Sequence, residues 1–405
     1  MRERISLESA IEKCCEQQRP CRNIETIPVE HGYKRVIAKD LKAFCDVPPF
    51  NSSRMDGYAL CRSDLDILKN LSDSDSLSLQ VVAHISAGNS AKLRLLPGQT
   101  VRIMTGAIVP EETAAIIKQE DITRTGEERI CIGRGKYHHS NILFKGSLIK
   151  AGQELVSAGE LLNYNQVERI ASTGIPELPV YIQPAVYIIN TGSELTLPGK
   201  PLAEGKIYNS NRSLLTAKLQ KEHCKILIGQ CPIEDNLEDI YREINRGLET
   251  ADMVIISGGA ADGDYDLVPS ALKKIKADFI YNGLRMQPGA KSSAAVKDGK
   301  LVFSLPGNPG ANGILFEALI MPILNKLKGM KNITNNWFEV VLAGNTIKST
   351  NLRRMCRGEL LERCGSLVAR PIINNEPIKG ITSVILDVEP GQGNEDDIVR
   401  AMLVR

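Results

Sequence analysis

The middle of the chain alternates short apolar runs with segments of helical periodicity. The apolar runs cover 185–189, 225–228, 253–257 and 301–304. The segments whose apolar residues recur at helical spacing cover about 211–221, 236–248 and 311–327. Buried strands that alternate with helices of this length are typical of a mostly parallel, doubly wound sheet. The sequence therefore predicts a central α/β domain over 182–330.

The regions on both sides of this domain carry short β-like runs. Residues 46–149 contain such runs between Gly, Pro and Asp/Ser clusters, and residues 331–405 return to the same pattern. Representative runs lie at 80–83, 100–103, 115–117, 339–342 and 383–386. Residues 71–78 are rich in Ser and Asp and are predicted to form a loop. The pattern predicts a β-rich inserted domain and a small C-terminal β-domain.

Two separated segments are expected to form a further unit. Residues 6–17 and 159–174 have the apolar spacing of helices, and residues 24–45 alternate like strands. Ser6 stands in the N-cap position of the first helix. We expect a discontinuous, linker-type N-terminal domain, and the fold class is an α/β multidomain protein. The four predicted parts are 1–45 with 150–181, 46–149, 182–330 and 331–405.

Composition and charge narrow the function classes. A chain of 405 residues is too long for one hydrophobic core. Its 50 basic and 48 acidic residues give a net charge of +2, which argues against nucleic-acid or membrane-surface binding. No window approaches the roughly 18 uninterrupted apolar residues of a membrane span, and the N-terminus lacks a signal-peptide pattern. We expect a cytoplasmic protein that binds neither nucleic acid nor membrane.

Cysteine and histidine spacing does not predict a metal site. None of the ten cysteines stands in a Cys-x-x-Cys pair or in the spacing of a zinc site. We expect them to be mostly reduced thiols. His138 and His139 are adjacent and would point to opposite sides of a strand. We therefore expect these two histidines in a surface loop.

Three loops are expected at one edge of the predicted sheet. The loops are residues 190–195, 257–266 and 305–310, and each follows a buried strand. Ligands of open α/β sheets bind beyond the carboxyl ends of the strands. Glycines in these loops let backbone N–H groups approach an anion. The carboxylates there suit a divalent cation that bridges to a phosphate. Each loop taken alone is also compatible with an ordinary tight turn, and only their combination predicts a phosphate-binding site.

Five motifs in a fixed order carry a family resemblance. They are Met-Asp-Gly-Tyr-Ala (55–59), Met-Thr-Gly-Ala (104–107), Thr-Gly-Ser-Glu-Leu (191–195), Gly-Gly-x-x-x-Gly-Asp-Tyr-Asp (258–266) and Leu-Pro-Gly-Asn-Pro (305–309). With Gly-Lys-Ile-Tyr-x-x-Asn at 205–211, this set resembles the molybdopterin molybdenumtransferases, the MoeA and gephyrin E-domain family. The resemblance extends over almost the whole chain.

The resemblance implies a reaction and a set of site residues. Members take adenylylated molybdopterin, release AMP and insert molybdate into the dithiolene with a divalent cation, for which we expect Mg²⁺. The implied catalytic residues are Asp56, Glu194 and Asp266. The implied metal ligands are Glu194, Asp235 and Asp266. The implied substrate-binding residues are Thr105, Gly192, Gly258, Gly259, Gly263, Pro306, Gly307, Asn308 and Pro309.

Several positions depart from the family pattern. Two family lysines are replaced by Gln287 and Ala290, and Arg285 and Lys291 are the nearby cations that could substitute for them. Acidic residues of the family are replaced by Leu148 and Ser193, and Asp262 adds a negative charge to the glycine loop. Each charge-assisted contact contributes about 1.5–3 kcal/mol. The loss of two such contacts could weaken phosphate binding by roughly 100-fold.

Three functional hypotheses therefore remain open. The first is a molybdenum insertase with a rearranged set of cations. The second is a divergent relative that binds a pterin, another phosphorylated ligand or a protein partner without the transfer chemistry. The third is an enzyme of this fold that acts on a different nucleotide-like substrate. The resemblance also implies a homodimer in which Asp56 and Thr105 of one subunit face the pocket of the other, and contact with the molybdopterin adenylyltransferase.

Overall fold

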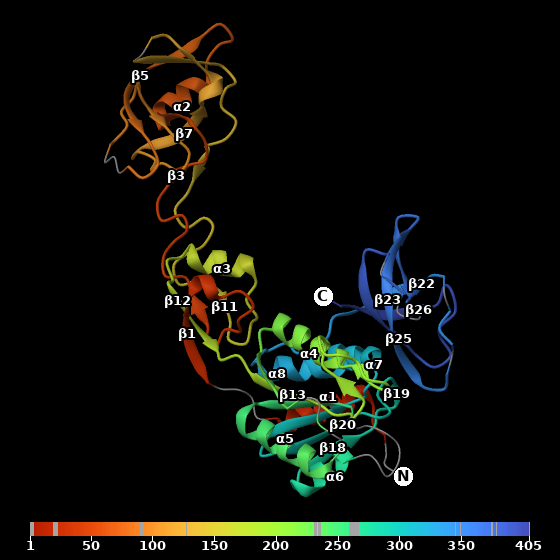
Figure 1. Cartoon of the computed structure of the whole chain (residues 1–405). Coiled ribbons are helices and arrows are strands. Elements are labelled where there is room, and N and C mark those ends of the chain that lie inside the picture. The colour runs from red at the N-terminus through yellow and green to blue at the C-terminus, as the bar shows by residue number, and fades with distance from the viewer. Residues whose placement is uncertain are drawn as a thin grey trace.

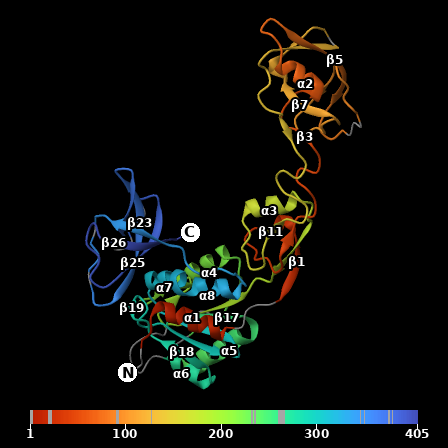
Figure 2. The ribbon, with the colours of Figure 1, turned by 180° about the vertical axis from the view of Figure 1, so that it is seen from behind.

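The molecule is elongated (Figures 1 and 2). A β-rich part lies at one end, a small β-paired part lies in the middle, and an α/β sheet and a C-terminal barrel form the other end. The computed structural model describes every residue except 1–3, 19–22, 90–92, 127, 231–232, 234–235, 259–266, 345, 349, 374–375, 378 and 405. The predicted site residues Asp235, Gly259, Gly263 and Asp266 fall outside the described residues.

The central sheet has six strands and is mostly parallel, as predicted. Its order is β16 (Lys225–Ile228), β13 (Ala185–Asn190), β17 (Met253–Ser257), β21 (Lys300–Leu305), β20 (Ser293–Lys297) and β18 (Asp278–Asn282). The first four strands are parallel, whereas β20 is antiparallel to both of its neighbours. Strands β18 and β20 were not predicted. In β20, Ser293, Ala294 and Ala295 lack the bulky side chains that mark a buried strand.

Helices cover both faces of this sheet. One face packs against α4 (Ser210–Lys221), α1 (Leu7–Gln17) and the continuous helix α7–η3–α8. This continuous helix consists of α7 (Pro309–Leu315), the π-helical turn η3 (Phe316–Ile320) and α8 (Met321–Leu327). The other face packs against α5 (Leu237–Thr250) and α6 (Leu267–Lys274). The predicted N-cap is present, since the Ser6 hydroxyl accepts from the Ser9 N–H at 3.1 Å.

The helix α1 belongs to the core of the α/β sheet. Leu7, Ala10 and Cys14 are buried with the residues of β13 and β21. The remainder of the predicted 1–45 segment pairs with later residues. These pairs are β1 (Ile24–Pro28) with β12 (Glu177–Tyr181), and β2 (Leu41–Lys42) with β11 (Glu154–Val156). The first helix therefore packs apart from the unit to which the sequence analysis assigned it. We keep the four-part division of the chain as a proposal.

Two secondary-structure predictions in the N-terminal half need correction. The helix expected over 159–174 is only α3 (Tyr164–Ala171), because Asn163 caps it in a box with Gln166. The helix α2 (Arg62–Lys69) was not predicted. It packs on a six-stranded sheet whose order is β7 (Thr113–Lys118), β4 (Gly57–Cys61), β6 (Gln99–Ile103), β5 (Ser76–Ile85), β9 (Arg129–Gly133) and β8 (Ile122–Arg124). The predicted 71–78 loop ends early, since Ser76 already pairs with Gly133.

The C-terminal region is a closed barrel of five strands. They are β23 (Arg353–Arg363), β24 (Ser366–Pro371), β22 (Trp337–Leu342), β26 (Ile398–Leu403) and β25 (Thr382–Val388). Pairing between β23 and β25 closes the ring. The short strand β19 (Met286–Gln287) of the α/β region also pairs with β23. The predicted small β-domain is thus confirmed as a barrel joined to the α/β region.

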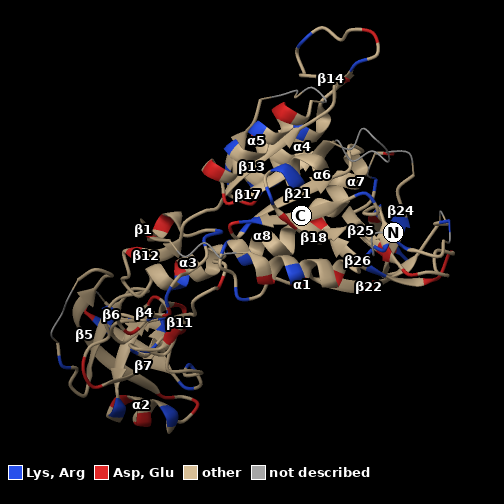
Figure 3. Ribbon diagram, turned by 90° about the horizontal axis from the view of Figure 1, so that it is seen from below, with Lys and Arg blue, Asp and Glu red and all other residues tan. Residues whose placement is uncertain are grey.

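The surface of the described part mixes both charge signs. Lys and Arg are interspersed with Asp and Glu along the ribbon (Figure 3). No helix among the described residues is long and apolar enough to cross a membrane. The eight cysteines that the structure describes are all free thiols.

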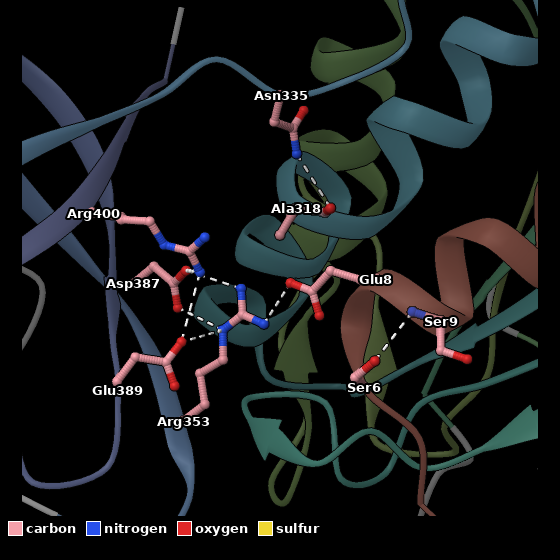
Figure 4. Close-up of polar contacts among 9 residues, drawn as sticks. All are labelled: Ser6, Glu8, Ser9, Ala318, Asn335, Arg353, Asp387, Glu389 and Arg400. Carbon is pink, nitrogen blue, oxygen red and sulfur yellow. Dashed lines mark hydrogen bonds and ion pairs between the residues drawn. The ribbon is translucent and has the colours of Figure 1, made fainter.

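An ion network joins α1 to the barrel. Arg353 donates from Nε to Oδ1 of Asp387 at 2.7 Å and from Nη2 to Oδ2 at 2.9 Å. Its Nη1 donates to Glu8 of α1 at 2.6 Å, and Arg400 also donates to Asp387 (Figure 4). Asp387 is only 1% exposed. A carboxylate buried to this degree depends on its cationic partners, so Arg353 stabilises the contact between α1 and the barrel.

We expect Arg353→Met to lower the free energy of unfolding by about 3 kcal/mol, because Asp387 would keep only one partner. Urea denaturation followed by tryptophan fluorescence measures this, since the single tryptophan, Trp337, lies in the barrel. Arg363→Met is the matched control, because its pair with Glu395 is exposed on both sides and should contribute about 1 kcal/mol or less. Equal effects of the two substitutions would contradict the assigned role of Arg353.

Candidate functional site

Three loops leave the same edge of the α/β sheet. The parallel register pairs Asn190 with Ser257 and Ser257 with Leu305. The Thr191 N–H donates to the Ser257 carbonyl at 3.1 Å, and the Gly258 N–H donates to the Leu305 carbonyl at 3.2 Å. The structure therefore brings the predicted residues that follow these strands to one edge. They are Gly192, Glu194, Gly258, Pro306, Gly307, Asn308 and Pro309.

Close approach of the backbones explains why glycine stands at position 258. Gly258 has a φ of +100°, and a Cβ there would lie 2.2 Å from the Thr191 carbonyl oxygen. A Cβ on Gly307 would lie 3.8 Å from the Cα of Gly258, so these two loops are neighbours. Only glycine lets the first and second loops meet in this way. At position 258 the two loops therefore meet through their backbones.

Two asparagines hold the second and third loops together. The Ser257 hydroxyl accepts from Nδ2 of Asn211 at 2.8 Å and from Nδ2 of Asn312 at 2.9 Å. Nδ2 of Asn211 also donates to the Gly307 carbonyl at 2.7 Å. Nδ2 of Asn312 also donates to the Pro306 carbonyl at 3.5 Å. Asn211 extends from α4, Asn312 extends from α7, and both are buried. They fix the Pro306–Pro309 turn relative to the end of β17.

Sequence reasoning did not assign a role to either asparagine. Asn211 is the last residue of the motif that begins at Gly205, and its place in this motif was the signal that could have marked it as a site residue. Asn312 is a polar residue in an otherwise apolar helix, where a side-chain amide with a specific partner is the usual explanation.

The edge also contains buried polar atoms that lack partners among the described residues. They are Oδ1 and Nδ2 of Asn190, Oγ1 of Thr191, Oδ1 of Asn211 and Oδ1 of Asn312. Each such atom costs about 1–3 kcal/mol if it stays unsatisfied. Polar atoms are rarely left in this state, and they cluster here beside the three loops. The arrangement suits a site that holds ordered water or polar ligand groups.

Among the predicted metal ligands, the structure describes only Glu194. It is exposed, and its carboxylate folds back over Gly192, where a Cβ would lie 2.6 Å from Oε2. Glu194 immediately precedes β14 (Leu195–Thr196), which pairs with β15 (Ile207–Tyr208), and the loop between these two strands projects from the sheet (Figure 3). Ser193 is exposed, and its carbonyl accepts from Lys206. The described residues contain no cluster of three His, Cys, Asp or Glu that could hold a metal.

The candidate replacement cations lie in a loop at the same edge. This loop runs from β18 to β20, and Ser293 at its end pairs with Ser304 of β21. Arg285 and Lys291 are both exposed in this loop. Gln287 pairs with Arg354 through β19, so the barrel supports the loop. The structure thus places this basic segment beside the three loops, together with the altered positions Gln287 and Ala290.

Asp56 and Thr105 lie in the distant β-rich part. The Thr105 N–H and its hydroxyl both donate to Oδ1 of Asp56 at 2.8 Å. These two hydrogen bonds, backbone first, lower the pKa of the Asp56 carboxyl. Gly57 must be glycine, because a Cβ would lie 2.1 Å from the Ile117 carbonyl oxygen. Within one chain the structure does not bring this pair to the sheet edge (Figures 1 and 2).

The fold and the loops together define a molybdopterin-binding type of protein. Residues 187–326 match the family described as a probable molybdopterin binding domain. Residues 5–174 match the MoeA N-terminal region (domain I and II). These two matches, together with the curated relatives described next, show that the chain belongs to the molybdopterin molybdenumtransferase family and is a transferase.

Curated relatives support this membership. A molybdopterin molybdenumtransferase of Staphylococcus epidermidis is 32% identical over 356 residues, which are 88% of this chain and 83% of the relative. A molybdopterin molybdenumtransferase of Staphylococcus aureus is 30% identical over 355 residues, which are again 88% of this chain and 83% of the relative. The resemblance noted from the sequence motifs is therefore confirmed.

Solved structures agree over the whole length. A molybdopterin biosynthesis MoeA protein from Pyrococcus horikosii has a TM-score of 0.77 and 28% identity, and the match covers 100% of both chains. Another from Pyrococcus horikoshii OT3 has a TM-score of 0.80 and 23% identity, covering 99% of this chain and 100% of that one. The predicted fold class is confirmed.

We expect Thr105→Val to raise the pKa of Asp56, while the remaining backbone N–H keeps it below the ordinary value. The pKa of this carboxyl is lower in the folded protein than in the unfolded chain. The interaction therefore stabilises the fold at pH values above the ordinary pKa of Asp, and this stabilisation is lost as the pH falls through the lowered pKa. A carbon-detected NMR titration of the Asp56 carboxyl measures the shift. Thr113→Val is the control, since its hydroxyl has no partner among the described residues. An unchanged Asp56 pKa in Thr105→Val would contradict the assigned contact.

Proposed function

We propose that this protein inserts molybdate into adenylylated molybdopterin and releases AMP, with Mg²⁺ as the divalent cation. The observation that carries the proposal is the single sheet edge at which the three glycine-containing loops meet. The relatives named molybdopterin molybdenumtransferase supply the substrate class. The product would serve molybdenum cofactor biosynthesis, and we expect the protein to work in the cytoplasm.

Each part of the edge has a proposed role. Backbone N–H groups near Gly258 and Gly307 would hold phosphate oxygens, and the loop with Arg285 and Lys291 would add positive charge. Glu194, Asp235 and Asp266 would hold Mg²⁺, since carboxylate oxygens are its preferred protein ligands. The ion would neutralise the charge of the pyrophosphate.

Asp56 is proposed to act at this edge from a partner subunit. Hydrogen bonds from Thr105 lower the pKa of its carboxyl, yet the β-rich part that carries Asp56 lies far from the α/β sheet within one chain (Figures 1 and 2). A homodimer would resolve this separation. Large apolar side chains are exposed near the junction of the β-rich and middle parts, namely Phe44 at 82%, Leu148 at 61% and Phe144 at 53%. Such exposure supports an interface there. The molybdopterin adenylyltransferase remains a proposed partner for substrate delivery.

The second candidate is a relative that binds the same ligand class without transferring molybdenum. Gln287 and Ala290 favour it, because they remove two cations from a segment that lies at the anion edge. AMP release from adenylylated molybdopterin, measured with and without Mg²⁺ and molybdate, separates the two. Release that depends on both ions supports the insertase. Tight binding without release supports the second candidate, and neither binding nor release supports an enzyme for another nucleotide-like substrate.

We expect Asp266→Ala to lower AMP release by at least about 100-fold, because a proposed metal ligand and its charge would be lost. Circular dichroism should show an unchanged fold. The matched control is Asp73→Ala, whose side chain is 92% exposed in the β-rich part and whose release rate should stay at the wild-type value. Undiminished release by Asp266→Ala would overturn the metal-site proposal.

We expect light scattering to show a dimer at concentrations well above micromolar. Leu148→Lys should shift the species toward the monomer, since it would place a charge in the proposed apolar interface. Ile398→Lys is the control, because it changes an equally exposed apolar residue on the barrel. A monomeric wild-type protein would contradict the shared site.

A further inference from the structure

A half-buried arginine lies beside Asp56 in the β-rich part. The register of β4 and β6 pairs Tyr58 with Arg102, while Asp56 precedes β4 and Thr105 follows β6. The pKa of the Asp56 carboxyl is lowered first by the hydrogen bonds from Thr105 and, to a smaller degree, by the positive charge of Arg102. The guanidinium of Arg102 therefore lies within electrostatic reach of this carboxylate.

The guanidinium of Arg102 has a buried donor that the described part of the chain does not satisfy. Its Nε atom is buried and has no hydrogen-bond partner among the described residues. Asp56 does not fill this place, since Thr105 supplies both hydrogen bonds to its Oδ1. Three other half-buried arginines each form an ion pair with a carboxylate, namely Arg35, Arg353 and Arg370. A buried cationic donor without a partner is costly, so its presence points to a partner that binds from outside the chain.

The neighbourhood of Arg102 is open to solvent. The register of β5 and β6 places His84 next to Arg102, and both His84 and Thr105 are exposed. An anion in solution can therefore approach the guanidinium along this side of the sheet. Arginine presents its N–H groups as a planar fork, which matches two oxygens of a phosphoryl group or of a similar tetrahedral oxyanion.

We propose that Arg102 binds a tetrahedral oxyanion, which is either a phosphoryl group of the adenylylated substrate or molybdate. The inference rests on the proposed function, because the β-rich part would bring Arg102 together with Asp56 to the sheet edge of the partner subunit. The segment with Gln287 and Ala290 lacks two cations. Arg102 would add one positive charge to the assembled site. Both anions present negatively charged oxygens in the same arrangement, so the experiment must distinguish them.

Steady-state AMP release by the full chain tests the proposal when the concentrations of adenylylated molybdopterin and of molybdate are varied separately. Arg102→Met removes the guanidinium and keeps an apolar stem, so it should raise KM for one of the two substrates roughly tenfold or more, with kcat within about threefold of wild type. A raised KM for adenylylated molybdopterin identifies the phosphoryl group, and a raised KM for molybdate identifies the metal oxyanion. KM values for both substrates within about twofold of wild type would overturn the proposal.

Arg129→Met is the matched control. Arg129 is an exposed arginine of the same sheet and pairs with Gln80, four residues before His84 on β5, so its KM values should stay within about twofold of wild type. Arg102→Lys keeps the charge without the fork and should give a KM between those of Arg102→Met and the wild type. Circular dichroism checks the fold of each variant, and Arg102→Gln replaces Arg102→Met if the latter does not fold.

Calorimetric titration of the full chain separates this inference from the proposed function. If the wild type releases no AMP, the insertase proposal fails, and the affinities for adenylylated molybdopterin and molybdate decide the inference. Weaker binding of one of them by Arg102→Met supports it, whereas equal binding of both, or no binding of either by the wild type, overturns it. If the wild type releases AMP and Arg102→Met has wild-type KM values, the insertase proposal stands and the inference fails.

Discussion

The hydroxyl of Ser257 accepts hydrogen bonds from Asn211 and Asn312, and the arrangement of the candidate site depends on these contacts. Ser257 ends the central strand β17, while the two amides come from helices on one face of the sheet. Because each amide also donates to a carbonyl of the Pro306–Pro309 turn, the strand end, both helices and the turn are fixed together. Their burial strengthens these bonds, since water does not compete for them.

Much of the α/β region could be predicted from the sequence, because its strands are short apolar runs and its helices have regular spacing. The predicted strand at 253–257 and the predicted helix at 211–221 agree closely with β17 and α4. Local pattern does not reveal the partner of a helix, and so the packing of α1 against the α/β sheet was not predicted. Strands made of small residues, such as β20, lack the bulky side chains that such patterns detect.

The loops at the sheet edge could be predicted from the sequence, whereas the two asparagines that support them could not. Gly192, Gly258 and Pro306 are recognisable because glycine and proline mark turns whatever the tertiary contacts are. Asn312 could not be given a partner from sequence, since its contact to Ser257 spans 55 positions of the chain. The distance of Asp56 from the sheet edge is likewise a property of the elongated arrangement, which spacing along the chain does not encode.

The strand β19 has a mechanical consequence. Met286 and Gln287 pair in parallel with Arg353 and Arg354, so a backbone ladder ties the segment at the sheet edge to the wall of the barrel. Any tilt of the barrel must pull this segment with it. The same tilt would change the width of the gap between α7 and β25. The pairing of β19 with β23 thus couples the position of the barrel to the loop that carries Arg285 and Lys291 and to the width of the gap beside α7.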